Sequence, residues 1–227
     1  MKKVLFLAFM FCASFILNAQ LAYFPSEGTV LTYHNLDKKG KIESKIVYKV
    51  ESVKQSGENA EVTYFVESYG KKDELVFKDR ITFKKEGDKL FFDMSNFVNK
   101  GAFQQNGEIP ATVEIEGNSL EVPINGTAGQ SLPDANMTIA SDMGFVKLKM
   151  TTNIVNRKVD DIEDLTVPAG TFNCMKISGD VSGKILGMNM SGKSVQWYSS
   201  GIGMVKSETY DKKGELSGSM VLVAVSK

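Results

Sequence analysis

The sequence predicts an all-β protein, a large antiparallel meander that curves into a half-barrel or a barrel with little or no helix. Runs rich in Val, Ile, Thr, Tyr and Phe alternate with a period of two residues, and clusters of Gly, Asn, Asp and Lys end them repeatedly. No later segment keeps a helical period. Because many runs exceed an ordinary strand and short turns make successive strands neighbours, a twisted sheet of this size should curl.

Residues 1–19 are typical of a secretory signal peptide. Two lysines precede an apolar stretch that ends at Leu17, and we expect cleavage after Ala19. The stretch is too short for a stable membrane anchor, which needs about 20 residues. We therefore expect one mature β domain, residues 20–227, without a transmembrane segment and located in the periplasm or outside the cell.

Composition limits the partners and the sources of stability. Loss of Lys2 and Lys3 with the leader leaves 25 basic residues against 27 acidic ones, with both signs interspersed. This balance disfavours nucleic acid and anionic membrane surfaces as main partners, because both attract a basic face. Of the two cysteines only Cys174 survives cleavage, so an intramolecular disulfide is impossible and the core must supply the stability.

Alternation gives each predicted strand one apolar face. From residue 75 to residue 83, for example, the odd-numbered positions are mainly large and apolar. The turn signals stand at residues 37–40, 56–59, 70–73, 86–88, 117–118, 125–126, 168–170, 199–203 and 211–214. The predicted core faces hold Ile46, Tyr48 and Val50; Val62, Tyr64 and Val66; Leu75, Phe77, Ile81 and Phe83; Val146, Leu148 and Met150; and Met220, Leu222 and Ala224.

Two segments depart from this pattern. Residues 95–103 are the only place where a short helix fits. Residues 125–142 contain Pro133 and several glycines, show neither period and are longer than ordinary loops. Three roles are open for this long loop, namely a lid, a binding loop, or a linker that divides the sheet into two halves.

The search for catalytic chemistry finds no site. Motifs of serine hydrolases, phosphate-binding loops and dinucleotide-binding turns are missing. His34 and Cys174 could form a nucleophilic pair only if the fold brought them together, and they are too few for a zinc site. The acidic group at residues 160–164 does not match a calcium loop and is interpreted as a solvated turn. We therefore expect no enzyme, no cofactor and no metal.

A curled sheet with aromatic and methionine side chains on one face can leave a cavity. The candidate lining residues are Phe77, Asp79, Met188, Met190 and Trp197. Asp79 falls between apolar neighbours, so we expect it to be paired with a base, exposed by a bulge, or placed at a polar spot of the cavity. The methionines suit a variable apolar ligand and an ordinary core equally well.

Two segments near the C-terminus carry a resemblance to a known family. Residues 167–177 read VPAGTFNCMKI and residues 195–208 read VQWYSSGIGMVKSE. Both resemble motifs of the TapB-like family, exported β proteins of Bacteroidota that belong to a domain-of-unknown-function group. The resemblance implies a curved sheet similar to the half-barrels of lipoprotein-carrier proteins and a periplasmic or secreted location. It implies no activity and no catalytic residues.

Two functions from different classes follow. The first is a non-catalytic binding or carrier module of the cell envelope, in which the concave face of the sheet shelters an apolar small molecule or a lipid. The second is a structural or assembly module with a filled core that recruits another envelope protein through a sheet edge or the long loop. Free apolar volume inside the sheet distinguishes them.

Overall fold

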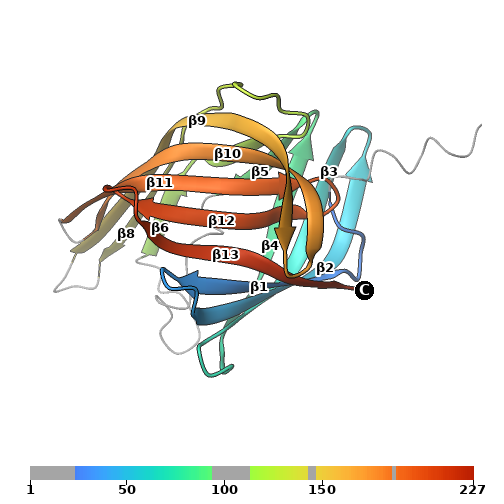
Figure 1. Ribbon diagram of the computed structural model, residues 1–227, viewed down its shortest axis with the longest axis horizontal. Coiled ribbons are helices and arrows are strands. Elements are labelled where there is room, and N and C mark those ends of the chain that lie inside the picture. Colours follow the sequence, from blue (N-terminus) through green and yellow to red (C-terminus); the bar gives the residue numbers. More distant parts are fainter. Residues whose placement is uncertain (1–23, 94–112, 143–146, 186–187) are drawn as a thin grey trace, which may run out of the picture.

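The computed structural model describes residues 24–93, 113–142, 147–185 and 188–227, and all regular elements in these ranges are strands (Figure 1). This confirms the all-β prediction. The described strands are β1 (Val30–Asp37), β2 (Ile42–Ser56), β3 (Asn59–Tyr69), β4 (Leu75–Glu86), β5 (Lys89–Asp93), β6 (Val113–Gly117), β7 (Ser119–Pro123), β8 (Ala135–Asp142), β9 (Lys147–Val167), β10 (Gly170–Ile185), β11 (Met188–Ser199), β12 (Gly203–Asp211) and β13 (Leu216–Ser226). The predicted leader, the short helix at 95–103 and Val146 lie outside the described residues. No described segment is a helix long and apolar enough to cross a bilayer.

All described strands join one antiparallel sheet in the order β6-β8-β9-β10-β11-β12-β13-β1-β2-β3-β4-β5-β7. Most neighbours in this order are consecutive in the chain, as the meander prediction requires. The two end strands, β6 and β7, are also consecutive and are separated only by Asn118. One extended segment, residues 113–123, therefore pairs with β8 through its first half and with β5 through its second half, which nearly closes the sheet into a barrel.

Asn118 stabilises the position at which this segment stops pairing with β8 and begins pairing with β5. Its Nδ2 donates to the carbonyl oxygen of Asp134 at 2.9 Å, and its Oδ1 accepts from the backbone N–H of Asn136 at 2.7 Å. Its own backbone N–H donates to the carbonyl oxygen of Asn136 at 3.2 Å. The side chain thus replaces ladder hydrogen bonds where the two strands separate.

A buried cation, Arg157, links the same two segments that Asn118 connects. Arg157 of β9 is only 3% exposed. Its Nη1 donates to the carbonyl oxygen of Pro133 and its Nη2 to that of Glu121 in β7, both at 2.7 Å. Burial lowers the pKa of Arg157. The guanidinium therefore links β9 to β7 and to the loop before β8 through backbone acceptors.

The segment predicted to be one long loop, residues 125–142, is a loop only in its first part. From Ala135 onward it forms β8, whose Ala135 and Ile139 are 1% and 4% exposed. The prediction was wrong for this part because the alternating stretch, Ala135 to Ile139, is short and directly follows Pro133, so the turn residues before it dominated the pattern. The remaining loop follows β9, where the N–H groups of Gly129 and Leu132 donate to the carbonyl oxygens of Val159 and Arg157.

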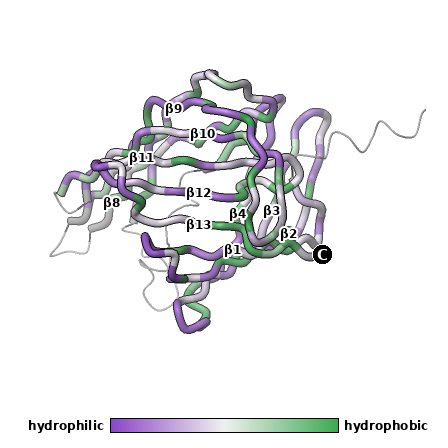
Figure 2. Tube along the Cα trace, in the orientation of Figure 1, coloured by the Kyte–Doolittle hydropathy of each residue, from purple (hydrophilic) through white to green (hydrophobic). Residues whose placement is uncertain are grey.

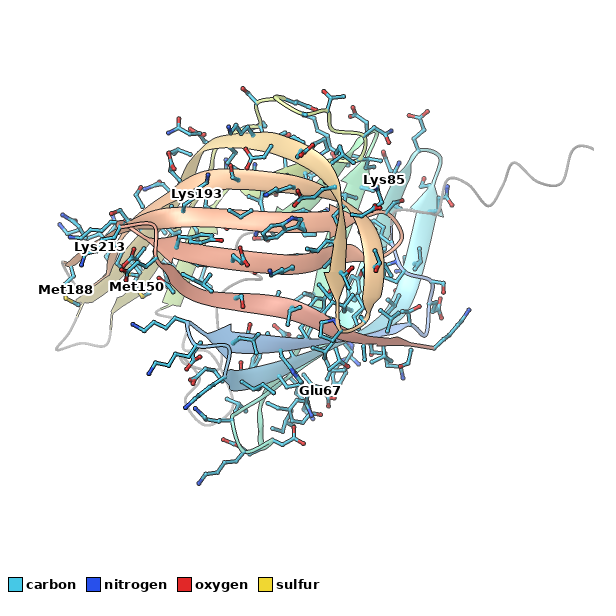
Figure 3. The ribbon with its side chains drawn as sticks, in the orientation of Figure 1. Glu67, Lys85, Met150, Met188, Lys193 and Lys213 are labelled. Carbon is cyan, nitrogen blue, oxygen red and sulfur yellow. The ribbon has the colours of Figure 1, made fainter. Side chains whose placement is uncertain are left out.

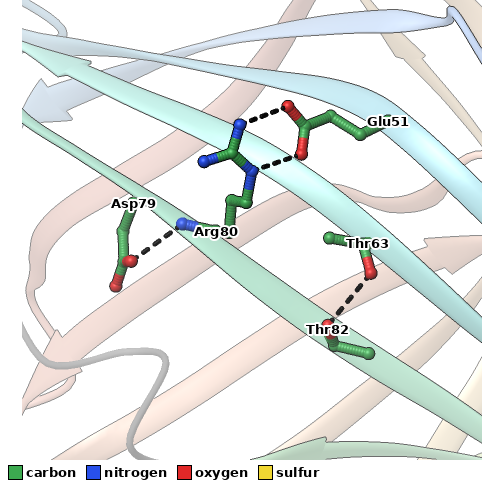
Figure 4. A network of polar contacts seen from close by, with 5 residues as sticks. All are labelled: Glu51, Thr63, Asp79, Arg80 and Thr82. Carbon is green, nitrogen blue, oxygen red and sulfur yellow. Dashed lines mark hydrogen bonds and ion pairs between the residues drawn. The ribbon is translucent and has the colours of Figure 1, made fainter.

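Apolar and polar residues alternate along the strands, and the hairpin turns are mainly hydrophilic (Figure 2). The apolar face of β2, β3 and β4 packs in the interior, which contains the predicted Tyr64 and Ile81. The other face carries ion pairs such as the two-pronged contact of Arg80 with Glu51, at 2.7 and 3.0 Å (Figure 4). Because this outer pair is exposed, it contributes little to stability.

Cys174 lies on β10 and is fully buried. Burial, with nearby Glu163 and Asp164, raises the pKa of its thiol to about 11. We expect iodoacetamide at pH 8 to modify Cys174 at least ~100-fold more slowly in the native protein than in urea, because the reactive thiolate is scarce and shielded. Mass spectrometry of timed aliquots measures both rates, and equal rates would contradict the buried placement.

Candidate functional site

Aromatic rings from successive strands form a chain on the inner face of the barrel. The five neighbouring ring pairs have centroids 4.7 to 6.0 Å apart, in edge or tilted arrangements. The rings belong, in order, to Tyr33 (β1), Tyr48 (β2), Tyr64 (β3), Phe83 (β4), Phe92 (β5) and Tyr198 (β11). The last contact crosses the interior, because β5 and β11 are not neighbours in the sheet.

These rings surround a cavity of about 60 Å³. Its lining consists of aromatic and aliphatic side chains and one glycine: Phe24, Leu31, Tyr33, Tyr48, Tyr64, Phe83, Leu90, Phe92, Tyr198, Ile202, Gly203, Met204 and Met220. Sites for drug-sized ligands enclose roughly 300–1,000 Å³. The cavity can therefore take a small group or a few waters as it stands, and a larger ligand requires lining side chains to move.

The four tyrosines of the lining differ in their hydrogen bonds. Tyr33 donates its hydroxyl to the carbonyl oxygen of Met204 at 2.7 Å, and Tyr198 donates to Oε1 of Gln196 at 3.1 Å. The hydroxyls of Tyr48 and Tyr64 have no hydrogen-bond partner within the described chain, although Tyr64 is only 4% exposed. Since buried polar groups in proteins almost always have a partner, these two hydroxyls are the lining groups available to bind a polar group of a ligand or a water.

All four phenols remain protonated at physiological pH. Burial raises the pKa of Tyr48 to about 12 and raises the pKa values of Tyr33, Tyr64 and Tyr198 further above the ordinary value for tyrosine. Tyr48 and Tyr64 therefore carry O–H donors and no negative charge.

Because Tyr33 has a hydrogen-bond partner and Tyr64 has none within the described chain, loss of the hydroxyl should affect protein stability differently at Tyr33 and at Tyr64. Tyr33→Phe should lower the free energy of unfolding by about 1–2 kcal/mol, because it removes the hydrogen bond to the part-buried carbonyl oxygen of Met204. Tyr64→Phe should be neutral or stabilising by up to about 1 kcal/mol, because it removes a buried hydroxyl without a partner in the described chain. Urea titrations of both variants test this, and equal losses would contradict the assignment.

The five residues predicted to line a cavity lie elsewhere, and their role as ligand contacts stays a prediction. Phe77 and Asp79 share the inner face of β4 but lie four to six residues from Phe83, about 13–20 Å along the strand. Met188, labelled in Figure 3, and Met190 are 66% and 56% exposed at the beginning of β11, far from Tyr198. Asp79 accepts a hydrogen bond from the N–H of Arg80 at 2.8 Å (Figure 4).

Trp197 is the fifth of these residues and packs on the outer face, opposite to Tyr198. Its indole N–H donates to Glu163 at 2.7 Å, and the ammonium groups of Lys176 and Lys206 lie 5.4 and 5.2 Å from its ring centroid. These neighbours explain how a tryptophan on the outer face is only 5% exposed. Motif residues 195–208 thus have a structural role here.

The same cluster predicts a pH effect. The indole hydrogen bond and Lys176 lower the pKa of Glu163. A carboxyl group with a lowered folded-state pKa stabilises the protein above its unfolded pKa, about 4.3, and this contribution disappears as the pH falls through the folded value. Wild-type protein should therefore lose more stability between pH 5 and pH 3 than Glu163→Gln, as thermal melts across this range would show. Parallel losses in both proteins would contradict the assignment.

The described residues show no arrangement for catalysis by metal or by a nucleophilic pair. They contain no group of three or more His, Cys, Asp and Glu side chains that could hold a metal ion. Three strands of the sheet order separate His34 on β1 from Cys174 on β10. The hydroxyl groups on side chains of the cavity lining are the four phenols.

Comparisons with known proteins agree with this architecture. The model of the DUF3108-like family matches residues 26–222. A Bacteroides fragilis protein described as exported and as having a YmcC-like fold is 18% identical, with a TM-score of 0.74 over 91% of this chain and 99% of the other. A Parabacteroides distasonis protein described as a lipoprotein is 24% identical, with a TM-score of 0.73 and the same coverage. At these identities the neighbours show the fold alone. No curated protein matches the sequence, and the narrower TapB-like resemblance stays a prediction.

Proposed function

We propose a function from the fact that this chain belongs to the DUF3108-like family. The proposed function is that of a non-catalytic binding module of the cell envelope, which takes an apolar group into its barrel. The aromatic cavity carries the proposal, because it combines an apolar lining with two hydroxyls, on Tyr48 and Tyr64, that have no partner in the described chain. The predicted leader and the descriptions of the two structural neighbours as an exported protein and a lipoprotein support the envelope location.

Because the cavity is small, a larger ligand can enter only if some of the lining side chains move. Phe24 and Ile202 line the cavity from outside the regular strands, the latter from the turn between β11 and β12. Loop side chains move at lower cost than side chains fixed within a ladder. A ligand larger than the free space would therefore displace these two side chains and leave the aromatic chain in place.

Uptake of N-phenyl-1-naphthylamine, a neutral apolar dye that fluoresces in apolar sites, tests the proposal. Met220 lines the cavity, and its neighbour Ser219 has its side chain on the opposite face of β13. We expect saturable dye binding to wild type and to Ser219→Trp, and at least ~10-fold weaker binding to Met220→Trp, since the indole fills the cavity. Native mass spectrometry of protein from its own host looks for a natural ligand.

Dye fluorescence that is unchanged by Met220→Trp would overturn this site. A ligand-free native mass together with no uptake of any apolar probe would overturn the binding function and favour the rival role, a filled structural module that recruits another envelope protein.

A further inference from the structure

We infer that the preferred ligand is a neutral apolar molecule with a hydrogen-bond acceptor, such as an ester or a ketone, and that Tyr48 and Tyr64 donate to that acceptor. This inference rests on the proposed function and adds the chemical class of the ligand.

The donors of the cavity require an acceptor. Tyr48 and Tyr64 lie on neighbouring strands with ring centroids 6.0 Å apart. Both hydroxyls lack a partner within the described chain, and Tyr64 is 4% exposed. Tyr33 and Tyr198 already donate to Met204 and Gln196. An apolar ligand without an acceptor would leave both hydroxyls unsatisfied, which is costly in a buried site.

The charge of the lining disfavours an anion. None of the lining residues carries a positive charge. The nearby buried cation, Arg157, already donates to the carbonyl oxygens of Pro133 and Glu121. A carboxylate moved from water into this apolar site would lose its hydration without gaining an ionic partner. A carbonyl group accepts from the same phenols at a much lower desolvation cost, so neutral acceptors are favoured over free fatty acids.

The experiment compares three ligands of similar length, methyl decanoate, sodium decanoate and undecane, as competitors of the neutral dye. In wild type at pH 7.5, methyl decanoate should bind more tightly than undecane, and decanoate most weakly. The loss of each hydroxyl should weaken ester binding about 3- to 10-fold and leave undecane binding unchanged or tighter, so the double variant Tyr48→Phe, Tyr64→Phe should lose the preference for the ester. Decanoate should compete better as the pH falls towards its own pKa.

Tyr69→Phe is the matched control. It makes the same chemical change outside the cavity, where the Tyr69 hydroxyl donates to Glu67, and should keep the preference for the ester. An ester preference that survives the double variant, or tighter binding of decanoate at pH 7.5, would overturn the inference but leave apolar binding intact. Failure of all three ligands to displace the dye, or of the dye to bind, would instead overturn the proposed function.

Discussion

Replacement of Arg157 by methionine should lower the free energy of unfolding by about 2–5 kcal/mol, a large share of the stability of a single domain. The guanidinium donates hydrogen bonds to the carbonyl oxygens of Pro133 and Glu121, both at 2.7 Å, and so links β9 to β7 and to the loop before β8. Methionine fills similar space but leaves both acceptors without a donor. Relief of the desolvated charge offsets part of this loss. Urea titration with tryptophan fluorescence measures the change.

Arg157→Lys separates charge from geometry. Lysine keeps the positive charge, but its single ammonium cannot reproduce the planar fork that reaches two carbonyl oxygens. We expect an intermediate loss and faster amide exchange in β7 and β8 than in β2 and β3. A loss below about 1 kcal/mol for Arg157→Met, or exchange that rises uniformly through the sheet, would contradict the role of Arg157 in closing the barrel.

The sequence predicted most of the strands and their inner faces, but it did not predict β8 or the closure of the sheet. Alternation placed Tyr48, Tyr64 and Phe83 on core faces, and the structure brings these rings together. Closure joins segments distant in the chain, through the pairing of residues 113–123 with β8 and β5 and through the hydrogen bonds of Asn118 and Arg157. A polar residue in a turn and an arginine in a strand have no periodic signal that names their partners.

The sequence predicted an aromatic inner face but not which residues line this cavity. An aromatic-lined interior was expected, but alternation gives the face of a side chain and not its position along the barrel axis. Phe77 and Asp79 share a face with Phe83 and still lie too far along β4 to line the cavity. At this point β11 is buried on both faces, with Tyr198 on the inner face and Trp197 on the outer face. Alternation between a buried and an exposed face therefore could not tell which of the two residues faces the interior.

Phe92→Ala should lower the free energy of unfolding by about 3–5 kcal/mol and at the same time strengthen dye binding to the protein that remains folded. Phe92 is 8% exposed, and its ring centroid lies 4.7 Å from that of Phe83 and 6.0 Å from that of Tyr198. Its removal takes away the ring that connects the two sides of the interior and enlarges the cavity beside it. Urea titration and dye titration at low urea measure the two effects separately.

Phe65→Ala is the control for this prediction, because Phe65 lies on the outer face of β3 beneath Arg80. It should cost less than about 1.5 kcal/mol and leave dye binding unchanged, since no cavity forms in the interior. A binding cavity and a filled core make different demands on Phe92. If its ring only fills the core, Phe92→Ala loses stability without a gain in dye affinity, whereas a site that opens for a ligand must show both changes together.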